Sequence, residues 1–89
     1  MRITAFALFC GAILLSGIAF AEEFGSRCAY GLAEYAKEVN TDCSVNWKDP
    51  QTGKTYCFSS ERSKQLFLQK PEENIRKAES AYAKLQAKQ

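Results

Sequence analysis

The chain has 89 residues, of which 46% are hydrophobic and 25% charged, with a formal net charge of +2. This length provides one small domain and is too short for a cofactor-binding α/β enzyme. The chain has no histidine, which excludes Ser-His-Asp and Cys-His catalysis and imidazole metal ligands. The charge is also too small for a nucleic-acid surface. We therefore expect a non-enzymatic domain with no nucleic-acid partner.

Residues 1–21 have the pattern of a secretory signal. Arg2 precedes a nearly uncharged run that ends in Ala19-Phe20-Ala21, directly before Glu22. A basic start, an apolar core and an A-x-A site are typical of an export signal. The alternative is an uncleaved membrane anchor, because the run is just long enough to span a bilayer. We expect cleavage and a periplasmic or secreted protein, which contacts a membrane only if this segment is retained.

Cleavage leaves residues 22–89 with three cysteines, Cys28, Cys43 and Cys57. An odd number of cysteines in an oxidising compartment predicts one disulfide and one remaining thiol. A chain of this size usually needs a cross-link or a partner, because its core is small.

The first part of the mature chain has the weaker pattern. Residues 22–27 are mostly polar and predict a flexible lead-in. In residues 28–42, an apolar spacing typical of a helix closed by Asn40 is formed by Leu32, Tyr35, Ala36 and Val39. Gly31 leaves an extended knuckle open as the alternative.

Residues 43–58 predict a β-hairpin. Two β-prone runs, 43–47 and 54–58, flank a loop that contains the turn formers Pro50 and Gly53. If Asn46 lies opposite Lys54, then Cys43 lies opposite Cys57 and the two sulfurs can form a cross-strand disulfide.

Two helices are expected after the hairpin. Ser59 or Ser60 caps a helix that ends near Gln69. Pro71 then opens an amphipathic helix over residues 72–89. Its apolar stripe consists of Ile75, Ala78, Tyr82 and Leu85. We expect this stripe to pack on the hairpin; the alternative is a face for a protein partner or for self-association.

The stretch Gly53–Pro71 resembles the YHS domain, a small module related to the TRASH treble-clef metal-binding families. The resemblance rests on Gly53-Lys54-Thr55-Tyr56, a following aromatic residue, and a helix with Phe67 before Pro71. It covers about residues 28–71. The resemblance implies an α+β fold, a small β-hairpin packed on a short helix (ββα), here with an additional C-terminal helix. It also implies a metal held by cysteines at the knuckle and the helix start, in heavy-metal sensing, trafficking or resistance.

The chain departs from the family pattern at the metal ligands. Ser59 and Ser63 stand where the family has paired cysteines, and Cys57 takes a position that is usually aromatic. Residues 28–31 resemble the family's knuckle, but only one of its cysteines, Cys28, is present. Because serine hydroxyls are poor ligands for soft metals, the resemblance carries over the fold and not the ligand set.

Three uses of Cys28, Cys43 and Cys57 stay open at this stage. One is a Cys43–Cys57 disulfide with Cys28 left as a thiol, worth about 3 kcal/mol for a loop of about 15 residues. Another is a three-thiolate site for Cu(I) or Zn²⁺. The third is a redox thiol, in which Cys28 attacks or resolves the pair. The sequence thus predicts an exported YHS-like module that binds a soft metal or serves a metal-handling pathway; the alternative is a disulfide-stabilised protein-interaction module without metal.

Overall fold

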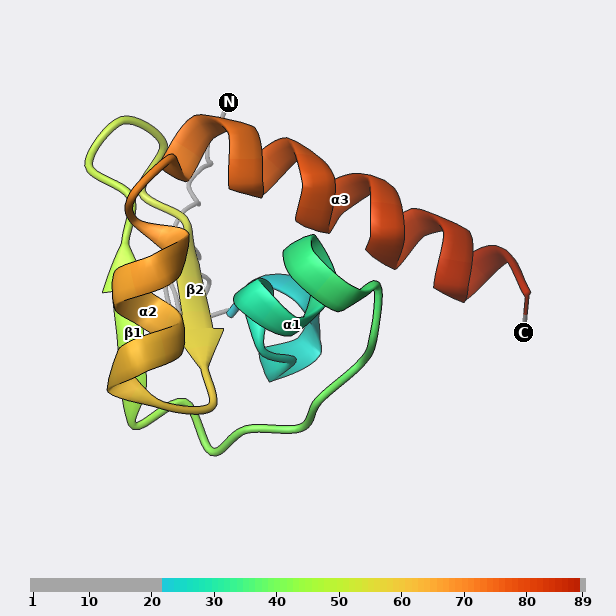
Figure 1. The fold of residues 1–89 in the computed structure, drawn as a ribbon, viewed down its shortest axis with the longest axis horizontal. Coiled ribbons are helices and arrows are strands. Elements are labelled where there is room, and N and C mark those ends of the chain that lie inside the picture. Colours follow the sequence, from blue (N-terminus) through green and yellow to red (C-terminus); the bar gives the residue numbers. More distant parts are fainter. Residues whose placement is uncertain (1–21, 89) are drawn as a thin grey trace, which may run out of the picture.

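In the computed structural model, which describes residues 22–88, a β-hairpin lies between two helical segments before it and two helices after it in the chain (Figure 1). A short 3₁₀ segment, η4, is followed by one hairpin and three α-helices. Their bounds are η4 Glu23–Ser26, α1 Ala29–Tyr35, β1 Val45–Lys48, β2 Thr55–Phe58, α2 Glu61–Phe67 and α3 Pro71–Ala87. The predicted α+β class, with a hairpin, a short helix and a C-terminal helix, is confirmed. The predicted signal, residues 1–21, lies outside the described residues. Within residues 22–88, no helix combines the length and the apolar character needed to cross a bilayer.

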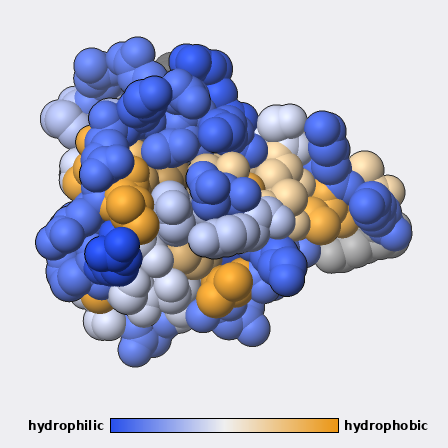
Figure 2. Space-filling view, in the orientation of Figure 1, coloured by the Kyte–Doolittle hydropathy of each residue, from blue (hydrophilic) through white to orange (hydrophobic). Residues whose placement is uncertain are grey.

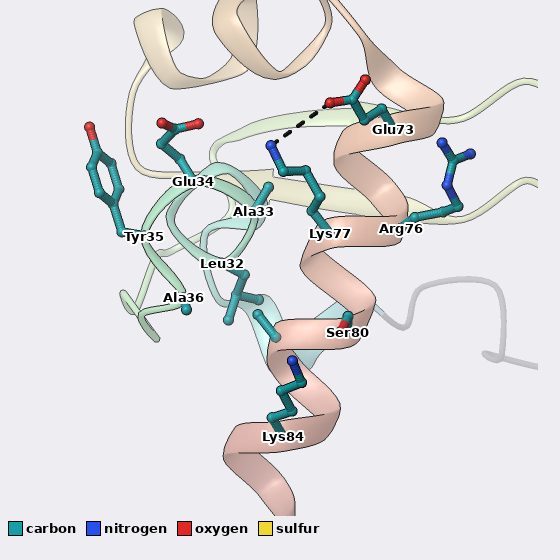
Figure 3. A pocket seen from close by; sticks show the side chains of 11 residues that line it. Leu32, Ala33, Glu34, Tyr35, Ala36, Glu73, Arg76, Lys77, Ser80 and Lys84 are labelled. Atoms are coloured by element: carbon teal, nitrogen blue, oxygen red, sulfur yellow. Dashed lines mark ion pairs between the residues drawn. The ribbon is translucent and has the colours of Figure 1, made fainter.

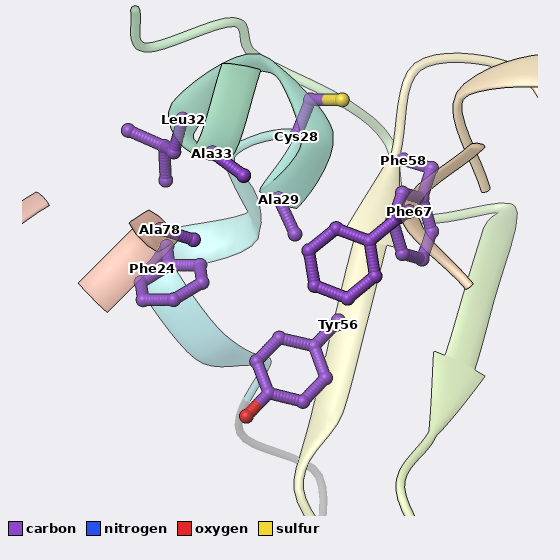
Figure 4. Packing of buried hydrophobic residues seen from close by; sticks show 9 residues of the cluster. All are labelled: Phe24, Cys28, Ala29, Leu32, Ala33, Tyr56, Phe58, Phe67 and Ala78. Carbon is purple, nitrogen blue, oxygen red and sulfur yellow. The ribbon is translucent and has the colours of Figure 1, made fainter. Parts of the chain in front are cut away.

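The hairpin presents one apolar face to α2. Its antiparallel register pairs Val45 with Phe58 and Trp47 with Tyr56. Because directly opposite residues project from the same side of a sheet, all four side chains share one face. The Tyr56 and Phe58 rings lie 6.0 and 5.1 Å from the Phe67 ring of α2. This face forms the aromatic half of the core (Figure 4).

The predicted hairpin register is wrong by three residues. Asn46 lies opposite Cys57, not opposite Lys54. A shift by an odd number of residues exchanges the two faces of one strand, so the predicted register would have separated the apolar side chains of the two strands. The loop fixes the observed register: the Asp49 N–H donates to the Lys54 carbonyl at 2.8 Å, and the Gly53 N–H donates to the Asp49 carbonyl at 2.7 Å. Gly53 has a φ of +77°, which glycine adopts without steric cost.

Helix α1 ends earlier than predicted. Ala36 adopts a left-handed conformation with φ +53°, and its N–H donates to the carbonyls of Gly31 and Leu32. This cap closes the helix at Tyr35, so Val39 lies beyond it. Leu32 is buried as expected, but Tyr35 is 63% exposed and Val39 40% exposed.

Residues 22–27, which the sequence predicts as a flexible lead-in, pack against the rest of the domain. Phe24 of η4 is only 8% exposed. Its ring lies 5.8 Å from that of Tyr56 and 5.2 Å from that of Tyr82, so it fills the space between β2 and α3. Burial of one aromatic side chain stabilises this otherwise polar segment. The segment is also tied to the domain by a β-bridge between Glu22 and Thr55.

Helices α2 and α3 begin as the sequence predicts. The Ser60 hydroxyl accepts a hydrogen bond from the Ser63 N–H at 3.1 Å and caps α2. Helix α2 ends at Phe67, before the predicted Gln69. Pro71 occupies the first turn of α3, which extends past α1 to the C-terminal end of the chain (Figure 1).

Candidate functional site

Cys43 and Cys57 form a disulfide, in agreement with the pairing considered from the sequence. Their Cα atoms lie 4.8 Å apart. Cys43 precedes β1 and has a left-handed backbone with φ +61°. Its N–H donates to the Thr41 hydroxyl at 3.1 Å, and that hydroxyl donates to the Ser26 carbonyl at 2.7 Å. The disulfide therefore joins β2 to a segment that is also bonded to the N-terminal part of the domain.

Cys28 lies beside this disulfide and is almost completely buried, at 1% exposure. Its backbone pairs with that of Cys57 in an isolated parallel bridge. Its sulfur accepts hydrogen bonds from the N–H groups of Gly31 and Ser59, each at 3.4 Å. The thiol thus caps the N-terminus of α1 and fastens it to the end of β2.

The Cys28 sulfur contacts one of three neighbouring serine hydroxyls. The thiol lies 3.6 Å from the Ser59 hydroxyl, which is 3.4 Å from that of Ser63. Ser60 donates to Ser63 at 3.1 Å. The fold therefore brings Cys28 together with Ser59 and Ser63, the two positions at which the predicted YHS resemblance would have paired cysteines. One sulfur and neutral hydroxyls are a poor ligand set for a soft metal.

The three-thiolate hypothesis does not fit this arrangement. Cys43 and Cys57 are bonded to each other, so neither supplies a thiolate. The Cys28 sulfur is engaged by Ser59 and by its own helix. Across residues 22–88, no group of three or more cysteine, histidine or acidic side chains is placed to hold a metal ion. The Cu(I) or Zn²⁺ site expected from three thiols is therefore not formed in this oxidation state.

The apolar stripe of α3 contacts the rest of the domain. Ala78 is fully buried, and Ile75, Tyr82 and Leu85 pack against the core cluster. The expectation of intramolecular packing agrees with this placement, but the main neighbour of α3 is α1, not the hairpin. The stripe is thus largely covered within the chain.

An open groove remains between α1 and α3 (Figure 3). It has a volume of about 630 Å³. Its floor is apolar and consists of Leu32, Ala33, Ala36 and Ala81. Lys77 lies along the α3 side and pairs with Glu73 at 3.9 Å. Lys84 lies about two helical turns further along α3. The groove has both an apolar floor and basic side chains.

Tyr35 lies at the end of this groove and, together with Val39, lines a neighbouring depression of about 560 Å³. Tyr35 and Val39 are the most exposed large hydrophobic side chains of the described residues. The Tyr35 ring contacts the Tyr30 ring edge-on, with centroids 6.1 Å apart. Partial burial raises the pKa of Tyr30, and the neighbouring Glu34 carboxylate raises it further. The surrounding surface is mostly hydrophilic, with small separate hydrophobic areas (Figure 2).

Two other side chains have shifted pKa values. Burial raises the pKa of Tyr56 to about 12, and Glu23, Glu79 and Asp49 add to the shift. Hydrogen bonds from the Ser44 N–H and hydroxyl lower the pKa of Asp42. Tyr56 is a core residue and Asp42 orders the turn before Cys43, so both shifts reflect the fold and not a catalytic group.

Comparison with protein-family models, curated proteins and solved structures finds no match to this chain. The YHS resemblance remains a prediction from the residues alone.

Proposed function

We propose that this protein is an exported, non-enzymatic protein-interaction module whose fold is closed by the Cys43–Cys57 disulfide. The observation that carries the proposal is the exposure of Tyr35 at the end of α1, between the α1–α3 groove and a depression that it lines together with the exposed Val39. The cysteines, by contrast, are engaged in the disulfide or in contacts of the buried Cys28. Within residues 22–88, the Tyr35 surface is exposed, while the one free thiol, that of Cys28, is buried.

Tyr35 has the properties of an interface anchor. Tyrosine is enriched among the residues that dominate binding energy, because it combines a large apolar ring with a hydroxyl. The Ala36 cap holds the backbone after Tyr35, and Tyr30 supports its ring. An anchor that is already ordered loses little conformational entropy when a partner binds.

The charges around this end of the groove indicate the chemistry of the partner. Lys37 and Lys84 are exposed, and neither forms an ion pair within residues 22–88. Lys84 lines the groove together with Ala36, and Lys37 is the residue after Ala36. The basic side chains that line the groove (Arg76, Lys77 and Lys84) outnumber the acidic ones (Glu34 and Glu73). A complementary segment would place an apolar side chain on Tyr35 and Ala36, and carboxylates opposite the two lysines. We therefore propose a polypeptide partner with an acidic, apolar segment.

The first test separates this function from metal handling. Intact mass is measured without reductant, after alkylation under denaturing conditions, and Cu(I) is titrated against a competing chelator. We expect mature protein about 2 Da lighter than the thiol form, one alkylated cysteine and no tightly bound Cu(I). Three alkylated cysteines and one equivalent of bound Cu(I) would instead support the metal-handling function.

The second test addresses the surface itself. A photoreactive residue is placed at position 35 and, as the matched control, at the exposed Lys54 of the hairpin loop. We expect one cross-linked protein from position 35 only, in the cell that makes the chain. That protein, once purified, should bind Tyr35→Ala about tenfold or more weakly than wild type, while Lys54→Ala binds normally. Equal binding by Tyr35→Ala would contradict the proposal.

A further inference from the structure

A second pocket lies away from the Tyr35 surface, between the loop that joins β1 to β2 and the beginning of α3 (Figure 1). It has a volume of about 320 Å³, which is in the range of small-molecule sites. Its walls are mostly apolar, and its polar groups are few. Its lining includes Trp47, Pro50, Pro71, Ile75, Asp49 and Glu72.

Trp47 provides the aromatic wall. Its ring stacks on that of Tyr56, with centroids 6.0 Å apart and an interplanar angle of 25°. The indole is thereby fixed in orientation, and it remains only partly buried. Indole is the aromatic group that attracts a cation most strongly.

Carboxylates carry all the charge that lines this pocket. Asp49 is 7% exposed and is held by hydrogen bonds from the Gln51 N–H at 3.0 Å and the Thr52 hydroxyl at 3.1 Å. Glu72 is exposed and forms no ion pair within residues 22–88. No lysine or arginine of the described chain lines the pocket. A bound group of positive charge would therefore be favoured electrostatically.

Glu72 lies at the beginning of α3, where the helix itself affects a bound charge. The N-terminus of a helix carries a partial positive charge, which opposes a cation. Glu72 lies in the first turn of α3 and compensates that charge. Of the two carboxylates, Glu72 is the one without hydrogen bonds that fix it to the loop. Cation binding should consequently depend on Glu72.

We infer that this pocket binds a small organic cation, an alkylammonium group, between Trp47 and Glu72. The aromatic wall and the carboxylate attract the charge, while Pro50, Pro71 and Ile75 contact the alkyl substituents. This inference is independent of the proposed protein-interaction surface, because the two share no residue.

The experiment compares choline with its neutral isostere 3,3-dimethyl-1-butanol, which has the same shape without the charge. Trp47 is the single tryptophan of the chain, so its fluorescence and its indole N–H resonance report on this pocket. With sodium chloride used to match ionic strength, we expect saturable binding of choline and about tenfold weaker binding of the isostere. A titration with Nα-acetyl-lysine N-methylamide identifies the source: tighter binding than choline assigns the pocket to a lysine side chain, weaker binding to a quaternary ammonium.

Two variants complete the test. Glu72→Gln should weaken choline binding about three- to tenfold. Glu73→Gln is the matched control, because Glu73 is the next residue of the same helix and lines the α1–α3 groove instead. Circular dichroism checks that both variants fold. The inference is overturned if the isostere binds as well as the cations, if neither cation gives saturable binding, or if the two variants weaken binding equally.

Discussion

Cys57 and Cys28 lie side by side at the end of β2, yet they are held in different ways. Cys57 is fully buried and covalently joined to Cys43. Cys28 is buried to the same degree, but it is held by a backbone bridge and by hydrogen bonds to Gly31 and Ser59. One attachment depends on the oxidation state of the protein and the other does not. Reduction should therefore release the segment before β1 from β2, while α1 should stay packed against β2.

The largest expected effect is the loss of the disulfide. Cys43→Ser should lower the free energy of unfolding by about 3 kcal/mol, because a cross-link over a separation of 14 residues restricts the unfolded chain. Urea denaturation measures this loss. Wild type in reductant should approach the variant, and reductant should have no further effect on the variant itself. A variant as stable as the oxidised wild type would show that the cross-link contributes nothing to stability.

A comparable loss is expected at high pH, at the residue before Cys57. The pKa of Tyr56 is raised from 10.0 to about 12 in the folded protein. Between these values the unfolded chain has lost the tyrosine proton and the folded protein keeps it, so stability falls as the pH rises. The total contribution is about 2–3 kcal/mol. Tyr56→Phe should remove this part of the loss of stability at high pH. Denaturation curves recorded from about pH 9 to about pH 12, which span the pKa values of the unfolded and the folded protein, measure it. Parallel curves for variant and wild type would contradict the shift.

A smaller effect is expected at Cys28. Cys28→Ala removes the sulfur that accepts from Gly31 and Ser59 and leaves a small cavity, at a cost of about 1–3 kcal/mol. This loss should be the same with and without reductant, which distinguishes it from that of Cys43→Ser. Cys28→Ser retains a hydrogen-bond acceptor and should be the milder change. A reductant-dependent loss in Cys28→Ala would indicate exchange between Cys28 and the disulfide.

The three cysteines show how much of the site could be predicted from the sequence. The sequence predicts a hairpin that brings Cys43 to Cys57, but it does so through a register that is wrong by three residues. The register did not follow, because Cys43 lies outside β1 with a left-handed backbone and reaches Cys57 from there. No local pattern places Cys28 beside Ser59, since the two residues are 31 positions apart in the chain.

Elsewhere the sequence lacked the tertiary contacts that decide the structure. Phe24 lies in a polar stretch, and this stretch is held by tertiary contacts, which include the packing of Phe24 against Tyr56 of β2 and Tyr82 of α3. The exposure of Tyr35 depends on the left-handed cap at Ala36, a residue type that does not usually signal such a turn. The cation pocket requires the hairpin loop and α3 to meet, which no local pattern indicates. Local periodicity thus predicts the elements well, and their contacts poorly.

The smallest expected effect concerns the turn that leads to Cys43. Asp42 accepts hydrogen bonds from the Ser44 N–H and hydroxyl, which lower the pKa of its carboxyl group. A lowered pKa means that the ionised form stabilises the fold above the pKa of the unfolded chain, and that this contribution is lost as the pH falls through the folded value. Asp42→Asn should therefore destabilise the protein slightly at neutral pH. At about pH 2, below the usual pKa of an aspartate, the variant and the wild type should be equally stable. The difference should be seen in thermal unfolding of both the oxidised and the reduced protein. If the stability difference vanished on reduction, the hydrogen bonds of Asp42 would stabilise the protein only by positioning Cys43 for the disulfide.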